Sequence, residues 1–254
     1  MLDVERRNQI FEAVERGNGA TVTELSERFG VSAATVRRDL ALLNSRGLIE
    51  RAHGGASPRR TRAAVEPPLL DRAGLQAEAK RRIGAAAAGY VSDGDTILVS
   101  GGTTTGAMVP HLAGRKGLTV LTNALNIALS LASHPSITVV VLGGLLRHSE
   151  LTVVGPLTEA ALDDLRAAKM FMGIPAVHVE HGFSADNLAE VGTDRALLAA
   201  TSDVTVLADH SKFGRVATVR VAPIRTARRL ITDSGAPTAD VARLREQQVL
   251  VDVV

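Results

Sequence analysis

The sequence predicts two domains of different fold class: an N-terminal α+β winged helix-turn-helix and a C-terminal α/β domain with an open, mostly parallel, Rossmann-like sheet. Short capped helices and a Gly-Gly hairpin make up the first 57 residues. From residue 90 onward, apolar β-branched runs alternate with alanine-rich helical runs, as in parallel sheets covered on both faces. Between them, SPRRTRAAVEPP (57–68) has no periodicity. We therefore expect domains at 1–57 and 73–254, joined by a linker at 58–72.

Start and stop signals divide the N-terminal domain into three helices and a hairpin. The first helix, over 5–16, ends at a Gly-Asn-Gly sequence. Thr21 and Glu24 have the spacing of a capping box, which opens a second helix that runs through Phe29. Ser32 is a suitable N-cap for a third helix that ends near Arg46, and LIERAHGGA then predicts a strand and a glycine hairpin.

The third helix carries two different faces. Val36, Leu40 and Leu43 form an apolar stripe at helical spacing, which is typical of a core-facing side. The opposite side carries small residues and arginines. Small side chains allow a helix backbone to approach base edges in the major groove, where arginine contacts guanine or phosphate. A small three-helix domain with solvated arginines has the same pattern, so spacing alone leaves both interpretations open.

Position on the helix separates the two arginines. Arg38 lies directly opposite the stripe and is the better candidate for reading a base, whereas Arg37, on the flank, is the better candidate for a phosphate. Hydroxyls near the helix N-terminus can donate to phosphate beside the free N–H groups there, and the hairpin tip can follow an adjacent groove. The candidate DNA-contacting residues are Ser32, Ala34, Thr35, Arg37, Arg38, Arg51, His53, Gly54 and Gly55.

The charge distribution agrees with a polyanionic partner for the first domain. Residues 1–62 hold eleven arginines and eight acidic residues, whereas the whole chain has a net charge of only +2. The basic excess is therefore confined to the N-terminal part, which indicates nucleic acid as its partner.

Six apolar runs are the strand candidates of the second domain, and four runs between them are the helix candidates. The strands are expected at 96–100, 118–122, 137–142, 169–173, 203–208 and 229–233, and the helices at 106–114, 123–133, 157–167 and 193–202. A further helix over 73–89 leads into the domain. In an open α/β sheet, ligands bind at the carboxyl ends of the strands.

A glycine–threonine turn, LVSGGTTTG (98–106), follows the first of these strands. It offers backbone N–H groups and hydroxyls to an anion, although it lacks the Gly-Lys-Ser/Thr sequence of a Walker A loop. Close packing explains such glycines equally well. Polar residues at the ends of other strands could converge there. The candidate effector-binding residues are Ser100, Gly101, Gly102, Thr103, Thr104, Thr105, Asn123, Gly144, Arg147 and Lys212.

Composition restricts the setting of the protein. The chain has no cysteine, which excludes disulfides and fits a reducing compartment. The N-terminus shows no apolar signal segment and no apolar run has the length of a membrane span, so we expect a cytoplasmic protein without membrane contact. His178 and His181 are too few to hold zinc, and we expect no metal and no cofactor.

Two sets of residues resemble the DeoR family of bacterial repressors. GVSAATVRRDLALLNSRGLIERAHGGA (30–56) is similar to the family's N-terminal signature, and LTNALNIALSL, VVVLGGLLR, VGP and ADHSKFGR follow in the order of its C-terminal domain. The resemblance, over residues 5–235, implies operator binding by the winged helix-turn-helix. It also implies a sensor domain similar in fold to ribose-5-phosphate isomerase, with phosphate contacts from Gly102, Thr103, Thr104 and Lys212.

The chain departs from the family pattern at three places in the sensor domain. Ser100 stands where the family has an acidic residue, and GIPAVHVEHGFSA (173–185) replaces a segment that bears glycine and aspartate. Asp194 stands where a basic residue is common. Loss of one acid and gain of another change the groups available to sugar hydroxyls. We therefore expect an unusual effector, or a weak response to sugar phosphates.

The expected function is that of a repressor of a sugar-metabolism operon, relieved when a phosphorylated sugar or related small anion binds the sensor domain. One small head makes few base contacts, so we expect a homo-oligomer, dimer or tetramer, on double-stranded operator DNA. An isomerase-like enzyme with a DNA-binding head would share these motifs, but no acidic array accompanies the glycine–threonine turn as a general base. A sequence-indifferent architectural DNA binder and a regulator without a sugar-phosphate response also fit the sequence.

Overall fold

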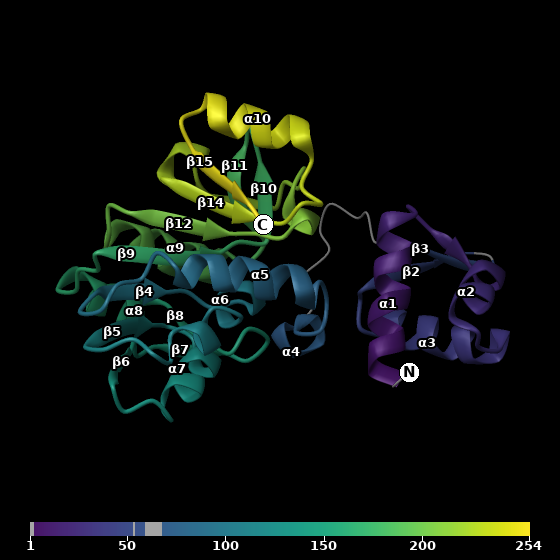
Figure 1. Cartoon of the computed structure of the whole chain (residues 1–254), viewed down its shortest axis with the longest axis horizontal. Coiled ribbons are helices and arrows are strands. Elements are labelled where there is room, and N and C mark those ends of the chain that lie inside the picture. The colour runs from purple at the N-terminus through teal and green to yellow at the C-terminus, as the bar shows by residue number, and fades with distance from the viewer. Residues whose placement is uncertain (1–2, 53, 59–67) are drawn as a thin grey trace. The chain divides into compact units, whose positions relative to one another are not determined.

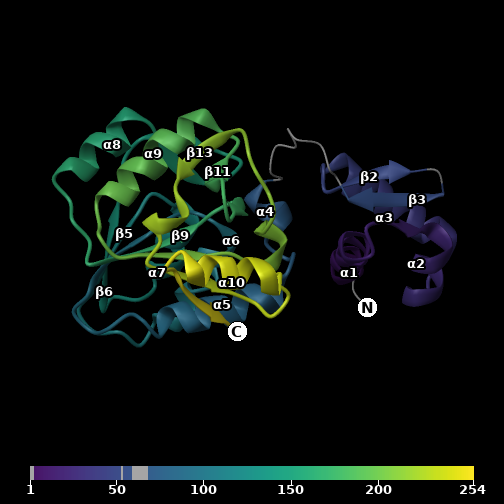
Figure 2. The same ribbon diagram turned by 90° about the horizontal axis from the view of Figure 1, so that it is seen from above.

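The structure is a computed structural model that describes residues 3–52, 54–58 and 68–254. It contains two compact units, residues 1–77 and 78–254 (Figures 1 and 2). Each unit has its own hydrophobic core. Within the described part of the chain, no helix combines the length and the apolar character needed to cross a membrane.

Three helices and a small antiparallel sheet form the first unit up to Pro58, which is the predicted winged helix-turn-helix. The helices are α1 (Asp3–Arg16), α2 (Val22–Phe29) and α3 (Ala33–Ser45). The strands are β1 (Ala20–Thr21), β2 (Ile49–Ala52) and β3 (Gly55–Pro58), in the order β1-β3-β2. The sequence did not indicate β1, because two residues are too few for a periodic pattern.

The predicted boundaries of α2 and α3 are confirmed at their caps. Thr21 Oγ1 accepts a hydrogen bond from Glu24 N at 3.2 Å, and the Glu24 carboxylate accepts one from Thr21 N at 2.8 Å, so the capping box is complete. Gly30 follows α2 with a φ of 63°, a left-handed conformation that favours glycine. The Ser32 side chain caps α3 by accepting from Thr35 N. The turn between the two helices is thus defined from both sides.

The apolar stripe of α3 faces the core of the first unit. Val36 and Leu40 are fully buried, and Leu43 is nearly so. They pack with Ile10 of α1 and Leu25 of α2. Burial of this stripe turns the small residues and arginines of α3 outward, as the helical spacing predicts.

The helix expected over 73–89 is wrong in its first part. α4 (Leu69–Arg72) ends before Gly74, and α5 (Ala77–Ala88) begins after Gln76, whose φ of 52° is not helical. Leu75, between the two helices, is 6% exposed and belongs to the core of the first unit. Asp71 of α4 also forms an ion pair with Arg46 at 3.4 Å. The segment that contains α4 therefore packs with the winged helix.

A parallel sheet of seven strands forms the centre of the second unit. In spatial order the strands are β15 (Leu250–Val253), β14 (Arg229–Thr232), β12 (Val204–Leu207), β9 (Lys169–Gly173), β4 (Thr96–Val99), β5 (Leu118–Thr122) and β6 (Ile137–Val141). Every neighbouring pair is parallel. The six predicted strands and the predicted α/β class are confirmed. β15 was not predicted, because its short apolar run is interrupted by Asp252.

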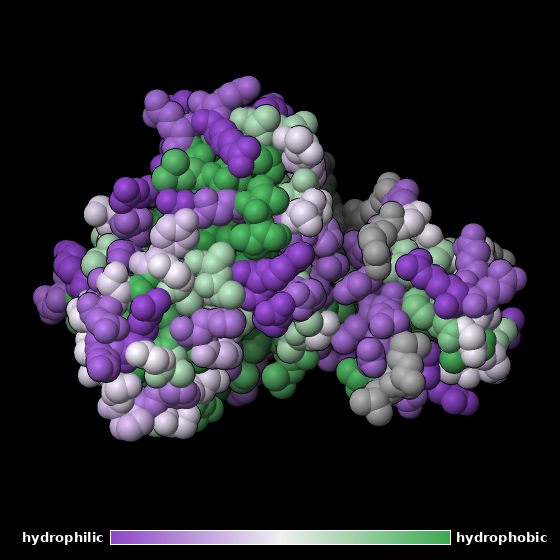
Figure 3. All heavy atoms as spheres, in the orientation of Figure 1, coloured by the Kyte–Doolittle hydropathy of each residue, from purple (hydrophilic) through white to green (hydrophobic). Residues whose placement is uncertain are grey.

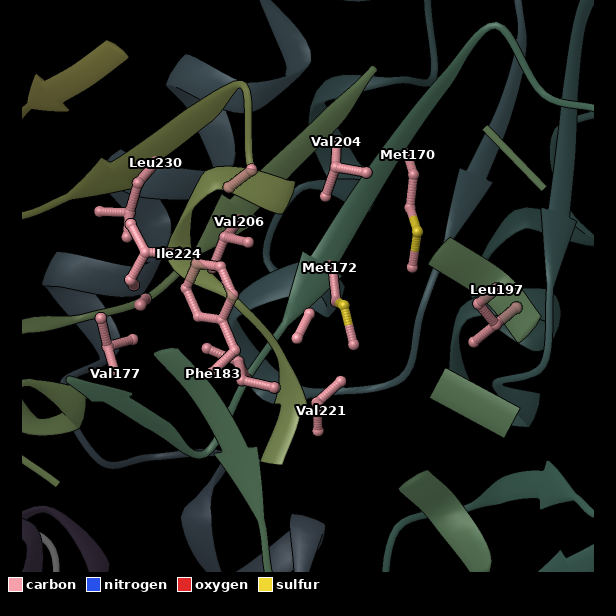
Figure 4. Close-up of a cluster of buried hydrophobic side chains, with 14 of the residues drawn as sticks. Met170, Met172, Val177, Phe183, Leu197, Val204, Val206, Val221, Ile224 and Leu230 are labelled. Atoms are coloured by element: carbon pink, nitrogen blue, oxygen red, sulfur yellow. The ribbon is translucent and has the colours of Figure 1, made fainter. Parts of the chain in front are cut away.

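Helices cover both faces of this sheet. α5, α7 (Leu125–Leu131) and the 3-10 turn η1 (Val109–His111) pack on one face. α8 (Pro156–Asp163), α9 (Leu188–Ala199) and α10 (Thr238–Glu246) pack on the other. Figure 4 shows the core of the second face, in which Met170 and Met172 of β9 lie beside Val204 and Val206 of β12. The near-continuous apolar strands are explained by this burial on both sides.

Two smaller antiparallel sheets complete the second unit. One contains β10 (Ala176–His178), β11 (Gly182–Ala185) and β13 (Val219–Ala222). The other contains β7 (Leu145–Arg147) and β8 (Thr152–Val154). Segment 173–185 therefore contains a β-hairpin, formed by β10 and β11. Two further 3-10 turns are η2 (His210–Lys212) and η3 (Ile224–Thr226).

The helix expected over 106–114 is wrong. α6 (Thr103–Gly106) has only four residues and precedes most of that run, and the three residues of η1 follow it. Pro110 has no N–H for a helical hydrogen bond, and glycines at both ends of the run favour other conformations. The glycine–threonine turn consequently leads into short turns rather than a long helix.

Candidate DNA-binding and effector sites

The outer face of α3 presents most of the predicted DNA-contacting residues. Ala34, Arg37 and Arg38 are exposed, and Thr35 is partly exposed. The hydroxyls of Ser32 and Thr35 lie 2.9 Å apart and share one hydrogen bond. Whichever hydroxyl donates that bond, the other keeps its hydrogen for an outside acceptor. The N-terminal half of α3 therefore offers two cations and one free hydroxyl donor.

A groove of about 550 Å³ between α1 and α3, here called the α1–α3 groove, lies beside this face. Arg6 crosses it: its Nε donates to Asp39 Oδ2 at 2.7 Å, and its Nη2 lies 3.0 Å from Asp3 Oδ1. Asp39 is only 4% exposed. Sequence reasoning missed this ion pair, although an acid beside the apolar stripe of α3 was a signal for one. The lining residues are Asp3, Arg6, Arg7, Val31, Ser32, Thr35, Arg38, Asp39 and Leu42.

The hairpin between β2 and β3 fits its predicted role only in part. Arg51 and Gly54 are exposed, whereas His53 lies outside the described residues. Gly55 is buried, and a Cβ there would lie 2.2 Å from the Ala20 carbonyl oxygen. A direct DNA contact from Gly55 is therefore wrong. Its lack of a side chain permits the pairing of β3 with β1 instead.

The strand order of the second unit has a switch point between β4 and β9. From β4 the chain proceeds through β5 to β6, and it then returns to the other side of β4 at β9. Ligands of open α/β sheets bind at such a point, outside the carboxyl ends of the strands. Ser100 and Gly173 stand there, and Ser100 Oγ accepts a hydrogen bond from Gly173 N at 3.1 Å. The serine hydroxyl thus joins the ends of these two strands.

The glycines of the glycine–threonine turn are required by close contacts. A Cβ at Gly101 would lie 2.2 Å from Thr152 Cγ2, and Gly102 has a φ of 143°. Thr105 Oγ1 donates to the Gly102 carbonyl at 3.1 Å, and both Thr104 and Thr105 are buried. Of the three threonines, only Thr103 is partly exposed to an incoming ligand.

Buried acceptor atoms without a hydrogen-bond partner line the same edge of the sheet. Asn123 follows β5, and its Nδ2 donates to the Val153 carbonyl at 3.2 Å. Among the described residues, Asn123 Oδ1, Thr152 Oγ1 and Asp209 Oδ2 have no partner. These three residues are at most 2% exposed. Buried oxygens in this state require a hydrogen-bond partner, which a hydroxylated ligand or a water would supply. Thr152 was not predicted from the sequence, because it begins the short strand β8 rather than following one of the predicted strands.

Arg147 is not free to act as the predicted anion partner. It forms an ion pair with Glu190 of α9, and Asp194 lies one helical turn further on. Burial raises the pKa of the Asp194 carboxyl well above its usual range; the Glu190 carboxylate raises it further, and the Arg147 guanidinium lowers it in part. Two acids therefore compete for one cation. An anionic ligand at Arg147 would have to displace Glu190.

The two remaining predicted positions lie apart from the glycine–threonine turn. Gly144 is exposed and lies against α8, since a Cβ there would lie 2.1 Å from Thr158 Oγ1, which accounts for the glycine. Lys212 is partly buried in η2, which follows β12 and so lies two strands from β4. At about 4.8 Å per strand, two strands are about 10 Å apart. A ligand that contacts both Lys212 and the glycine–threonine turn must therefore be larger than one phosphate.

Neither histidine of segment 173–185 is arranged as a metal ligand. The rings of His178 and His181 lie 4.7 Å apart. His178 Nδ1 accepts hydrogen bonds from the backbone N–H groups of Glu180 and His181, both at 3.2 Å. Within the described ranges, no group of three or more histidine or acidic side chains is placed to hold a metal ion.

Comparison with known proteins identifies the architecture. Residues 6–61 match the family model of the DeoR-like helix-turn-helix domain. Residues 75–234, more than half of the chain, match that of the DeoR C terminal sensor domain. The chain belongs to the DeoR family. This DeoR-family protein is thus a DNA-binding transcriptional regulator, with α3 as the second helix of its helix-turn-helix and the β4–β9 switch point inside its sensor domain.

Relatives of this DeoR-family protein match over nearly their full length. The transcriptional regulator YulB of Bacillus subtilis is 32% identical over 254 residues, which are 100% of this chain and 98% of that protein. The glycerol-3-phosphate regulon repressor of Escherichia coli is 31% identical over 100% of both chains. A putative aga operon transcriptional repressor of Escherichia coli is 30% identical over 98% of this chain and 93% of its own.

Solved structures with a related arrangement include ribose 5-phosphate isomerase A from Neisseria gonorrhoeae. It is 19% identical over 57% of this chain and 56% of its own, with a TM-score of 0.42.

Proposed function

We propose that this regulator represses a sugar-metabolism operon and releases its operator when a phosphorylated sugar, or a related small anion with hydroxyl groups, binds the sensor domain. The observation that carries the proposal is the set of unpartnered buried oxygens of Asn123, Thr152 and Asp209 along the carboxyl-end edge of the sheet. One of these residues, Thr152, lies against the glycine–threonine turn at Gly101, and that turn offers backbone N–H groups to an anion. Donors for an anion and acceptors for hydroxyls are both needed to hold such a ligand.

The names of the relatives support the class of operon. One relative is a repressor of the glycerol-3-phosphate regulon and another of the aga operon. The departures in the sensor domain favour a ligand that differs from those of its relatives. Ser100 contributes a hydroxyl that is already bonded to Gly173, and Arg147 is paired with Glu190. We therefore expect a weak response to common sugar phosphates, or an effector with fewer negative charges.

The proposal includes a homo-oligomer in the cytoplasm. Figure 3 shows apolar residues gathered on the second unit below α10. The edge strand β15 also leaves Leu250 and Val253 48% and 45% exposed, and such an edge can pair with a second copy of the chain. A dimer or tetramer in the cytoplasm would place several DNA-binding heads on repeated half-sites.

We infer that the sensor domain has no isomerase activity. An isomerase needs a general base, and beside the glycine–threonine turn Ser100 offers a hydroxyl in place of a carboxylate.

Fluorescence-anisotropy binding to the chain's own upstream intergenic DNA tests the proposed function. The titration is made against a random duplex of equal length, with and without a panel of sugar phosphates and uncharged sugars. Specific binding that one compound releases supports the proposal and identifies the effector. Equal affinity for both duplexes would contradict it and favour an architectural DNA binder. Specific binding that no phosphorylated or hydroxylated anion alters would contradict the effector part alone.

A further inference from the structure

Two neighbouring arginines of α1 line the α1–α3 groove, and they differ in their partners. Arg6 is held by Asp3 and Asp39. Arg7 has no hydrogen bond or ion pair with any described residue, and it is partly exposed. The groove holds three arginines and two aspartates. Because Arg6 is engaged by both acids, the positive charge available to a ligand belongs to Arg7 and Arg38.

We propose that the α1–α3 groove receives a phosphate of the DNA backbone, with Arg7 as its cation and the Ser32–Thr35 hydroxyl pair as its neutral donor. Both hydroxyls line this groove, and one of them keeps a hydrogen to donate. A charged and a neutral donor that converge from two helices are a common arrangement for a phosphate. This inference rests on the DNA-binding role of α3.

The position of the groove agrees with the geometry of a helix in the major groove. At 3.6 residues per turn, Thr35 lies on one flank of the outer face of α3 and Arg37 lies on the other, with Arg38 between them. A helix in the major groove has a phosphate backbone along each flank. Arg37 would contact the phosphate backbone of one DNA strand and Arg7 that of the other. Together these two contacts would position Arg38 over the base edges.

The Arg6–Asp39 ion pair is then a positioning element. Asp39 belongs to α3 and is almost fully buried, while Arg6 belongs to α1 and its side chain is 11% exposed. Two hydrogen bonds from Arg6, at 2.7 Å and 3.4 Å, join the two walls of the groove. The pair also neutralises a carboxylate that would otherwise repel a phosphate. It keeps Arg6 itself away from DNA.

The test is the salt dependence of DNA binding by full-length Arg7→Gln. We expect the slope of log K against log salt concentration to fall by about 0.9, the value for one lost phosphate contact. The affinity at 0.1 M salt should fall about three- to tenfold, equally for the upstream and the random duplex. Arg7→Lys keeps the charge and should restore most of the slope. Arg82→Gln, an exposed position of α5, is the matched control for net charge.

Asp39→Asn gives an effect of the opposite sign. It releases Arg6, so the slope on random DNA should steepen by as much as about 0.9 while the preference for the upstream duplex falls. Loss of folded protein shifts log K but not its slope, so instability does not imitate this result. If Arg7→Gln behaves as Arg82→Gln does, or if it weakens only the upstream duplex, no phosphate binds in the groove. Because random DNA reports the contact, this test holds even if the operator preference fails.

Discussion

Arg37 and Arg38 are adjacent in α3, yet their positions on the helix give them different tasks. Arg38 lies opposite the buried stripe, and Arg37 lies on the flank away from α1. An arginine that reads a base contributes to sequence preference, whereas one on phosphate contributes to affinity for all sequences. Neither side chain has a hydrogen-bond partner among the described residues, so both are available to DNA.

We predict that Arg38→Ala relaxes sequence preference at a cost of about 1–3 kcal/mol at the affected base pair. Arg37→Ala should weaken binding to all sequences alike and reduce the salt slope by about 1. Anisotropy titrations on specific and random duplexes at several salt concentrations measure both. Identical behaviour of the two variants on both duplexes would show that this division is wrong.

Gly101 tests the glycine–threonine turn. We predict that Gly101→Ala destabilises the second unit by about 1–3 kcal/mol and weakens effector binding, because the new Cβ would meet Thr152 Cγ2. The readouts are thermal melting and a calorimetric titration with the effector found by the release assay. Thr152→Ser removes that methyl group, so the double variant Gly101→Ala/Thr152→Ser should regain the melting temperature that Gly101→Ala loses. Gly114→Ala, with no atom within 4 Å of its Cβ, is the matched control. An unchanged melting temperature in Gly101→Ala would refute the contact.

Asp194 gives the stability a definite dependence on pH. Its pKa is raised in the folded state, so between the unfolded pKa and the folded pKa the folded protein binds more protons. The stability from this group is therefore present at low pH and falls as pH rises through that window. We predict that Asp194→Asn raises the melting temperature at pH 8, by about 2–4 °C for ~1 kcal/mol, and changes it little at pH 4. The exposed Asp163→Asn is the control, and an equal effect at both pH values would contradict the prediction.

At the scale of elements, α4 belongs to the first unit with the winged helix, although it lies within the predicted linker, 58–72. Leu75 closes the core of the first unit and Leu69 is also buried, while Leu70 is 74% exposed. We predict that Leu75→Ala destabilises the first unit by about 2–5 kcal/mol, whereas Leu70→Ala leaves it nearly unchanged. Thermal melting of the full chain, followed by a probe in the first unit, measures the difference. Equal melting curves for the two variants would show that Leu75 has no role in this core.

Elements were predictable where a local pattern was complete. Capping residues at Thr21 and Ser32 defined the starts of α2 and α3, and unbroken apolar runs defined six strands of the main sheet. Local sequence patterns failed to predict elements that are too short or too irregular to show a periodicity. The apolar run of β15 is interrupted by Asp252, β1 has two residues, and β10 of the hairpin in segment 173–185 has three. Pairing with strands distant in the sequence stabilises β1 and β15, and no short window of sequence contains their partners.

At the scale of the whole molecule, the effector and operator DNA are proposed to favour different states of the same conformational equilibrium. If the effector lowers DNA affinity by a given factor, then DNA must lower effector affinity by the same factor. We predict this reciprocity, with a coupling of about 5- to 150-fold. The measurement is effector affinity by calorimetry with and without saturating upstream DNA, using random DNA as the control. Equal effector affinity in the presence and absence of upstream DNA would mean that binding in the sensor domain does not regulate the DNA-binding heads.

The sequence by itself determined the two fold classes, the outward face of α3 and the family, because caps, periodicity and long motifs are local and additive. The tertiary structure decided which candidates are available for function. It brought Thr152 against Gly101, paired Arg147 with Glu190, buried Gly55 in the pairing of β3 with β1 and joined Arg6 to Asp39. Each of these contacts joins residues distant in the chain, and burial then determines the charge and hydrogen-bond partners of each group. Local sequence specifies which groups are present, whereas long-range packing specifies which of them a ligand can reach.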